Sequence, residues 1–134
     1  MSAPATLSPG MLLPPLTIDA VDPEKMKLMA ALLRDPNPIH IDADAVAALG
    51  LGERPINQGP ANLSYLLNMV VGWRGAIDSL RSVDVRFLGN VFAGDRVECH
   101  GTVTAVDPET GLATLDVHAT AGDRRVLQGT ILVA

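Results

Sequence analysis

The sequence is poor in cysteine, in aromatic residues and in basic charge. Of its 134 residues only Cys99 is a cysteine, so neither an internal disulfide nor a cysteine-rich metal site can form within the chain. Aromatic residues make up 3%, which leaves few platforms for stacking the bases of single-stranded nucleic acid. The formal net charge of -5 also disfavours binding to a phosphate backbone. We therefore expect no nucleic-acid partner, and the single cysteine suits a cytoplasmic location.

Long hydrophobic runs are missing as well. The longest apolar stretch, residues 63–73, is interrupted by Ser64, Asn68 and Gly72 and falls short of the roughly 20 residues that a bilayer requires. Residues 1–15 have no basic segment ahead of a hydrophobic one, so we expect no signal peptide and no membrane partner. At 48% hydrophobic residues the chain can build a core, and its length fits one domain. Such a small apolar chain is expected to bury surface against another subunit.

Helical signals occur in the first half of the chain. Residues 1–15 are rich in proline and predict a loose or clamped arm, followed by an extended segment over residues 16–18. Asp22 as N-cap and Pro23 at the first helical position predict a helix that Pro36 stops. A short helix is expected over residues 43–49. A longer helix over about residues 60–73 is apolar on nearly all sides, which predicts that it is buried.

From Ser79 onward the hydrophobic period changes to two. Four segments alternate apolar and polar residues, and turn signals such as Gly94-Asp95 and Gly122-Asp123 separate them. This pattern predicts consecutive antiparallel strands that each have one buried face. One sheet and one wholly apolar helix predict a single α+β domain in which the antiparallel sheet wraps around the long central helix.

One loop concentrates the side chains that acid/base chemistry uses. The segment Asp35-Pro36-Asn37-Pro38-Ile39-His40 carries a carboxylate, an amide and an imidazole on a loop that two prolines stiffen. General acid/base catalysis needs such groups to be rigidly placed. A structural interpretation remains open, in which the segment stops a helix, makes a turn and buries one histidine ring.

A second motif, residues 55–60, lies directly before the long helix. Gly59 can bring a bare backbone N–H close to a ligand at the positive end of that helix. The alternative is a loop glycine that happens to precede Pro60, a proline suited to the first turn of a helix.

Together the two motifs resemble those of the MaoC-like (R)-specific enoyl-thioester hydratases, which have the hot-dog fold. The resemblance extends over residues 16–134 and rests on these positions: Asp35, Asn37, Pro38, His40, Asp42, Ala45, Ala48, Gly50, Pro55, Ile56 and Gly59. It implies a MaoC-like hot-dog domain over residues 16–134 after an arm of residues 1–15. It also implies that Asp35 and His40 are the catalytic pair, that Asn37 helps to hold the substrate site, and that the Gly59 amide binds the thioester carbonyl.

The implied reaction is the hydration of an enoyl thioester, or dehydration of a 3-hydroxyacyl thioester, carried by coenzyme A or an acyl-carrier protein. Water addition needs a base for the water at C3, a proton for C2 and stabilisation of charge on the thioester oxygen. Asp35, His40 and Gly59 supply these functions, although the sequence does not say which of the pair is the base. No metal and no cofactor beyond the thioester carrier is required, and the expected assembly is a homodimer or a heterodimer with another MaoC-like chain.

The sequence departs from the family pattern at two places. The family commonly has His-Gly-Met where this chain has Gln58-Gly59-Pro60, and Pro-Val where it has Asn90-Val91. Because proline has no N–H, an amide donor at the helix start must be that of Gly59 or lie outside this segment.

Three rival interpretations follow from the same residues. Thioesterases share the fold but lack the Asp-x-Asn-Pro-x-His motif. A non-catalytic, thioester-binding subunit of a heteromeric hydratase is the alternative from another functional class. A serine nucleophile at Ser64 lacks the Gly-x-Ser-x-Gly turn that would expose it. His100 and His118 fall at outward positions of predicted strands and are interpreted as surface residues rather than metal ligands.

Overall fold

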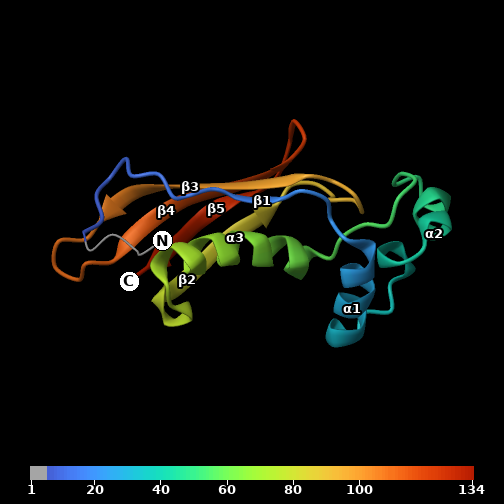
Figure 1. The fold of residues 1–134 in the computed structure, drawn as a ribbon, viewed down its shortest axis with the longest axis horizontal. Helices are drawn as coiled ribbons and strands as arrows, with labels where there is room; N and C mark the ends of the chain where they lie inside the picture. Colours follow the sequence, from blue (N-terminus) through green and yellow to red (C-terminus); the bar gives the residue numbers. More distant parts are fainter. Residues whose placement is uncertain (1–5) are drawn as a thin grey trace.

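In the computed structural model, which describes residues 6–134, one antiparallel sheet lies along a single long helix (Figure 1). Three short helical elements, α1, η1 and α2, gather beyond one end of that helix. The elements in chain order are β1 (Leu16–Ile18), α1 (Pro23–Leu33), the 3-10 turn η1 (Pro38–His40), α2 (Ala43–Ala48), α3 (Gly59–Arg74), the 3-10 turn η2 (Ile77–Ser79), β2 (Leu80–Phe87), β3 (Val97–Val106), β4 (Ala113–Ala121) and β5 (Arg124–Val133).

The strands follow the order β1-β3-β4-β5-β2, and every neighbouring pair is antiparallel. β3, β4 and β5 are joined by short turns, whereas β2 pairs with β5 at the far edge. The strand order makes β1 and β2 the two edges of the sheet. Gly129 of β5 lies so close to β2 that a Cβ atom there would collide with the backbone of Asp84 and Val85.

The core lies between α3 and the inner face of the sheet. α3 contributes Leu66 and Val70, both fully buried, and the strands contribute Leu115 and Ile131 at the same depth. Complete burial of such a side chain contributes about 1.5–3 kcal/mol. The alternation predicted for β3 and β4 is confirmed, because inward residues of both strands are buried in turn. The predicted α+β fold with a buried central helix is thus the observed one.

The described part of the N-terminal arm, residues 6–15, is anchored to the sheet rather than loose. Gly10 N donates to the Val103 carbonyl at 2.8 Å and Leu13 N to the Gly101 carbonyl at 2.9 Å. The Leu13 side chain is buried in the core. The arm thereby continues the line of β1 along β3, because Leu13 lies in the core and Leu7 and Met11 pack against it.

Two further expectations need correction. The alternation in β2 predicts a buried face, but Val83 and Phe87 are 40% and 54% exposed, because no element within residues 6–134 covers that part of the edge strand. Pro36 and Pro38 push the residues before them toward an extended conformation and so predict an extended loop over residues 35–39, yet this loop enters the 3-10 turn η1. Asn37 caps that turn and Pro38 occupies its first position, where its missing N–H costs nothing. Over residues 6–134, no helix has the length and apolar character that a membrane span demands.

Candidate active site

The loop that follows α1 is held by its own side chains. Arg34 ends the helix in the left-handed region with φ 51°, and Asp35 N donates back to the Ala30 carbonyl at 2.9 Å. A carboxylate oxygen of Asp35 then accepts from Asn37 N at 3.1 Å, and the Asn37 side-chain oxygen accepts from Ile39 N at 3.3 Å. These consecutive caps carry the chain directly into η1. The Asn37 oxygen therefore helps to fix the turn on which the histidine sits.

Asp35 and His40 are brought into contact by this loop. His40 Nε2 lies 3.1 Å from Asp35 Oδ2, and the other ring nitrogen, Nδ1, lies 2.6 Å from the Ile56 carbonyl oxygen. A carbonyl oxygen can only accept, so Nδ1 carries a proton and Nε2 is the nitrogen left to exchange one with its surroundings. The His40 side chain is 10% exposed and that of Asp35 31%, so water reaches the carboxylate side of the pair.

The pair is tied to the segment that leads into α3. Ile56, whose carbonyl accepts from His40, also donates its own N–H to the Ile39 carbonyl at 2.8 Å. Gly59, the first residue of α3, follows three residues later. The two sequence motifs, far apart in the chain, are thereby joined side by side.

The start of α3 has amide groups available for a ligand. Gln58 is the N-cap residue but its side chain makes no capping bond, and Pro60 has no N–H. The first amides of any helix have no acceptor within the helix, so the Gly59 N–H is a donor at the positive end of α3. The Gly59 amide therefore stays the predicted donor to the thioester carbonyl.

The buried Gln58 side chain faces α1 rather than the open site. Its Nε2 donates to the Met26 carbonyl at 2.8 Å, and the residue is 1% exposed. Its Oε1 is buried with no hydrogen-bond partner among the described residues. Where the family commonly has histidine, this chain therefore has an amide that ties α1 to the head of α3.

Sequence reasoning missed Phe87 and a buried polar cluster. A Cβ atom on Gly59 would lie 3.3 Å from Phe87 Cε1, so this aromatic ring forms the wall next to the helix start. Asn57 Nδ2 donates to Asn62 Oδ1 at 2.7 Å and to the Tyr65 hydroxyl at 3.1 Å. Burial raises the pKa of Tyr65, and the hydrogen bond from Asn57 partly opposes that rise. The only sequence signal for the cluster was an asparagine within an apolar helix.

Other candidate nucleophiles and ligands lie elsewhere. The Ser64 hydroxyl donates to the Ala61 carbonyl at 2.6 Å, and burial raises the pKa of Cys99 to about 12. His100 and His118 stack on each other on the outer face of the sheet, with ring centroids 5.3 Å apart. No group of three or more metal-ligating side chains is found within residues 6–134.

Comparisons with known proteins point to one family. The family described as "MaoC like domain" matches residues 8–122. A chain of the ChsH1-ChsH2 complex from Mycobacterium tuberculosis is 25% identical, with a TM-score of 0.85 over 96% of this chain and 98% of that chain. The (R)-hydratase from A. caviae involved in PHA biosynthesis is 25% identical, with a TM-score of 0.86 over 97% of this chain and 98% of its own.

A chain of the HadBC complex, a 3R-hydroxyacyl-ACP dehydratase from Mycobacterium tuberculosis, has the same fold at 20% identity. Its TM-score is 0.71, and the match covers 96% of this chain and 97% of that chain. None of the curated proteins matches this sequence.

Proposed function

Because this chain belongs to the MaoC-like hydratase and dehydratase family, we propose that it catalyses the (R)-specific hydration of 2-enoyl thioesters and the reverse dehydration of 3-hydroxyacyl thioesters. The observation that carries this proposal is the contact of 3.1 Å between Asp35 and His40, anchored through Ile56 to the head of α3. An acid and a base held side by side can direct the oxygen of water to one carbon of a double bond and a proton to the other.

In the proposed reaction the pair works as a unit on one face of the substrate. The Asp35 carboxylate takes a proton from a water molecule as its oxygen bonds to C3. The π electrons shift toward the thioester, and His40, which enters the step as an imidazolium with a proton on each ring nitrogen, delivers its Nε2 proton to C2. Asp35 is then neutral and His40 has lost a proton, so transfer of that proton across their contact restores the starting state.

The Gly59 amide is assigned to the thioester oxygen, on which negative charge develops as water adds. A donor already fixed at the positive end of a helix stabilises that charge without reorganising. Asn37 holds the turn that carries His40, and in this sense it helps to hold the substrate site. The chemistry uses no metal or redox group, and coenzyme A or phosphopantetheine enters only as part of the substrate.

We further propose that the working form is a dimer, either of two identical chains or with another MaoC-like chain. Val83, Phe87 and Leu88 lie on or just after edge strand β2 and are 40%, 54% and 48% exposed. An exposed apolar strand edge is a ready surface for pairing. Two structures of the same fold are the ChsH1-ChsH2 complex and the HadBC complex, which supports the heteromeric alternative.

The proposal is tested by assaying the purified chain on a panel of trans-2-enoyl-CoA thioesters through the loss of enone absorbance. The configuration of the product is determined by chiral chromatography, and the mass of the particle by light scattering. We expect the (R)-3-hydroxyacyl product from a dimer. Release of free thiol without hydration would identify a thioesterase instead. A chain that binds thioesters and turns over none would support the non-catalytic subunit.

A further inference from the structure

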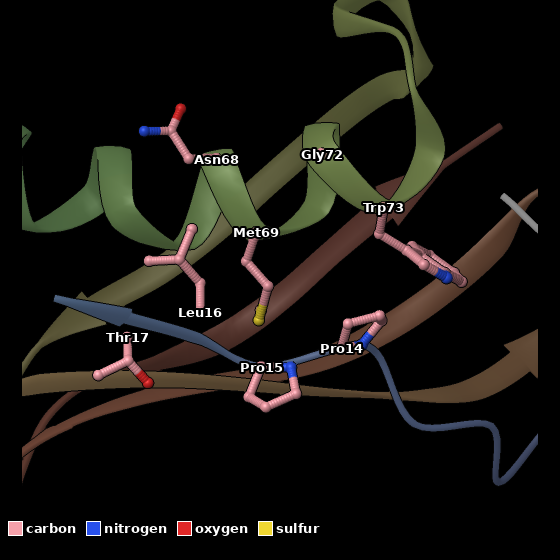
Figure 2. A pocket seen from close by; sticks show the side chains of 8 residues that line it. All are labelled: Pro14, Pro15, Leu16, Thr17, Asn68, Met69, Gly72 and Trp73. Carbon is pink, nitrogen blue, oxygen red and sulfur yellow. The ribbon is translucent and has the colours of Figure 1, made fainter. Parts of the chain in front are cut away.

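The face of α3 that packs on the sheet changes character along the helix. In the second half of α3 this face is apolar, and the Met69 and Trp73 side chains point toward residues 14–15, both prolines, beside a cavity of about 400 Å³ (Figure 2). Two turns before Met69 the same face carries Asn62, an amide that is 4% exposed. A polar side chain at that depth is costly unless it is hydrogen-bonded. The head of α3 therefore has a buried polar group where the rest of the helix packs apolar side chains.

Asn62 belongs to a polar cluster that Asn57 ties together. Asn57 Nδ2 donates to Asn62 Oδ1 at 2.7 Å and to the Tyr65 hydroxyl at 3.1 Å. Asn57 is also 4% exposed, and every fully buried polar atom of these three side chains has a partner. A buried polar cluster whose members are all satisfied specifies one arrangement more strictly than apolar packing does. The Asn57 side chain is therefore held in one orientation by α3.

The peptide group between Ile56 and Asn57 is bonded at both ends. Its carbonyl accepts from His40 Nδ1 at 2.6 Å, and its N–H donates to the Val91 carbonyl at 2.7 Å. The carbonyl and the N–H of a trans peptide lie in one plane and point in opposite directions. A rotation of the chain at Asn57 would therefore tilt the carbonyl that holds the His40 ring.

The peptide group between Gln58 and Gly59 is held by Asn62 as well. The Asn62 N–H donates to the Gln58 carbonyl at 3.1 Å, and the N–H of that same peptide is the Gly59 donor at the start of α3. Because the two groups of the peptide point in opposite directions, the Gly59 N–H points out of the helix. The bond between the Asn57 and Asn62 side chains thus links the direction of the His40 acceptor to that of the Gly59 amide.

We propose that Asn57 is a positioning residue of the active site. Its side chain sets the direction of the carbonyl that holds His40 and of the Gly59 N–H, and it acts through these two peptide groups rather than on the substrate. This inference rests on the proposed function, which assigns His40 to the proton for C2 and Gly59 to the thioester oxygen. Without the Asn57 donor, small rotations of residues 56–59 displace both groups, and a misplacement of about 1 Å can cost ~10²-fold in rate.

A pair of variants separates positioning from stability. Asn57→Leu keeps the size and branching of the side chain but donates nothing, so Asn62 Oδ1 stays buried without its donor and the thermal midpoint should fall. The double variant Asn57→Leu, Asn62→Leu removes both partners and should recover much of that loss, because neither side chain leaves a polar atom unpaired. Should Asn57→Leu fail to fold, the double variant carries the test.

The kinetic readout is the separate change of kcat and KM on a four-carbon enoyl-CoA. Both the single and the double variant should lower kcat about 10- to 100-fold. KM should change little, because His40 and Gly59 act on protons and charge that move only in the transition state. Tyr65→Phe is the matched control within the cluster. It removes one acceptor and leaves the bond between Asn57 and Asn62 in place, so kcat should change far less than in Asn57→Leu.

The ring proton of His40 gives a readout that needs no activity. The short bond of 2.6 Å between Nδ1 and the Ile56 carbonyl oxygen should move this proton far downfield in the proton NMR spectrum and slow its exchange with water. The signal is assigned by its absence in His40→Ala. It should shift upfield or be lost to exchange in both variants that carry Asn57→Leu, and it should stay in place in Tyr65→Phe.

The outcomes separate this inference from the proposed function. If the double variant keeps the wild-type kcat, or if its His40 signal does not move, Asn57 only stabilises the fold and the inference is wrong, while Asp35-dependent hydration would leave the proposed function intact. If the wild-type chain hydrates no enoyl thioester, the proposed function fails and the His40 signal decides alone. A displaced signal in a double variant with a near-wild-type thermal midpoint then supports the positioning role, and an unmoved signal overturns it.

Discussion

The sheet with α3 and the group of α1, η1 and α2, here called the lobe, are built in different ways. In the sheet, buried apolar side chains from neighbouring strands and from α3 form one continuous core. In the lobe, Met26 of α1 joins that core and Val46 of α2 is buried outside it, whereas Leu28 and Leu32 of α1 are 60% and 71% exposed. Apolar packing thus attaches the lobe to the rest of the fold mainly through Met26.

Directional bonds fix the lobe as well. Gln58 reaches the Met26 carbonyl, His40 reaches the Ile56 carbonyl, and Ile56 N–H reaches the Ile39 carbonyl. The candidate catalytic pair lies in the lobe and the binding amide at the head of α3. Activity should therefore depend on a few polar bonds, and stability on the apolar core. The predictions below test this separation.

The largest effect is expected from the pair itself. Asp35→Asn and His40→Ala should each lower kcat at least ~10²-fold, because a positioned acid or base contributes on that scale. Asp35 is partly exposed, so Asp35→Asn should change the thermal midpoint little, whereas His40→Ala also removes a buried ring and its bond to Ile56 and should lower the midpoint moderately. Steady-state kinetics and thermal unfolding measure the two quantities. Near-wild-type turnover in either variant would remove the pair from the mechanism.

A substitution in the core of the sheet should have the opposite effect, lowering stability but not kcat. Leu115 is fully buried, and Leu115→Ala should lower the free energy of unfolding by about 2–5 kcal/mol. Its kcat per folded molecule, measured well below the unfolding midpoint, should remain close to the wild-type value. A loss of kcat as large as that of His40→Ala would show that the two regions are not separable.

Gly59→Val is expected to lower kcat/KM about 10²-fold, the scale of a lost oxyanion donor. The new side chain would crowd the thioester oxygen and press on Phe87, whose ring lies 3.3 Å from the position of a Cβ atom. Kinetics on a short enoyl-CoA measure the effect, and the fold should persist because the residue stands in the first turn of α3.

Two controls accompany this variant. Pro60→Ala restores an N–H and should be tolerated. Phe87→Ala removes the ring that the valine would displace, so the double variant shows whether crowding of Phe87 or of the thioester causes the loss. Full activity of Gly59→Val would make Gly59 a loop residue only.

The sequence predicted the sheet side of this comparison better than the lobe side. Asp22 and Pro23 start α1 as expected, and alternation located β3, β4 and β5. Such signals are local and follow from capping and periodicity. The exposed face of β2 was not predictable, because alternation identifies an apolar face but not what covers it.

The bonds that attach the lobe were also beyond local patterns. Gln58 and Met26 are 32 residues apart, and no spacing rule relates a side-chain amide to a distant backbone carbonyl. The contact between Asp35 and His40 was suggested by a loop motif, but the anchoring of His40 to Ile56 depends on the tertiary fold. Side-chain bonds across the chain have no sequence signature of their own.

A smaller effect is expected when the Gln58 link is cut. Gln58→Leu removes the bond to the Met26 carbonyl, which lowers the free energy of unfolding, and also the unpartnered Oε1, whose loss raises it. The two effects partly cancel, so the net loss should not exceed about 1–2 kcal/mol. Amide exchange of α1 should accelerate and kcat should fall several-fold, since the lobe loses a directional contact. Unchanged exchange in α1 would contradict the role assigned to this bond.

The smallest effect concerns the outer face of the sheet. Burial lowers the pKa of His118, and the neighbouring Arg125 and His100 lower it further, while Asp116 opposes them. Below the unfolded pKa of about 6.5, the unfolded chain takes up a proton that the folded chain resists. The free energy of unfolding therefore declines as pH falls from about 6.5 toward the lower folded pKa, and this contribution is constant above that window.

His118→Gln should show a shallower decline between pH 7 and pH 5 in urea unfolding, with kcat unchanged because the ring stacks on His100 away from the lobe. Equal slopes for both proteins would mean that His118 titrates alike in the folded and unfolded chains, and an altered kcat would mean that the outer face of the sheet communicates with the catalytic pair.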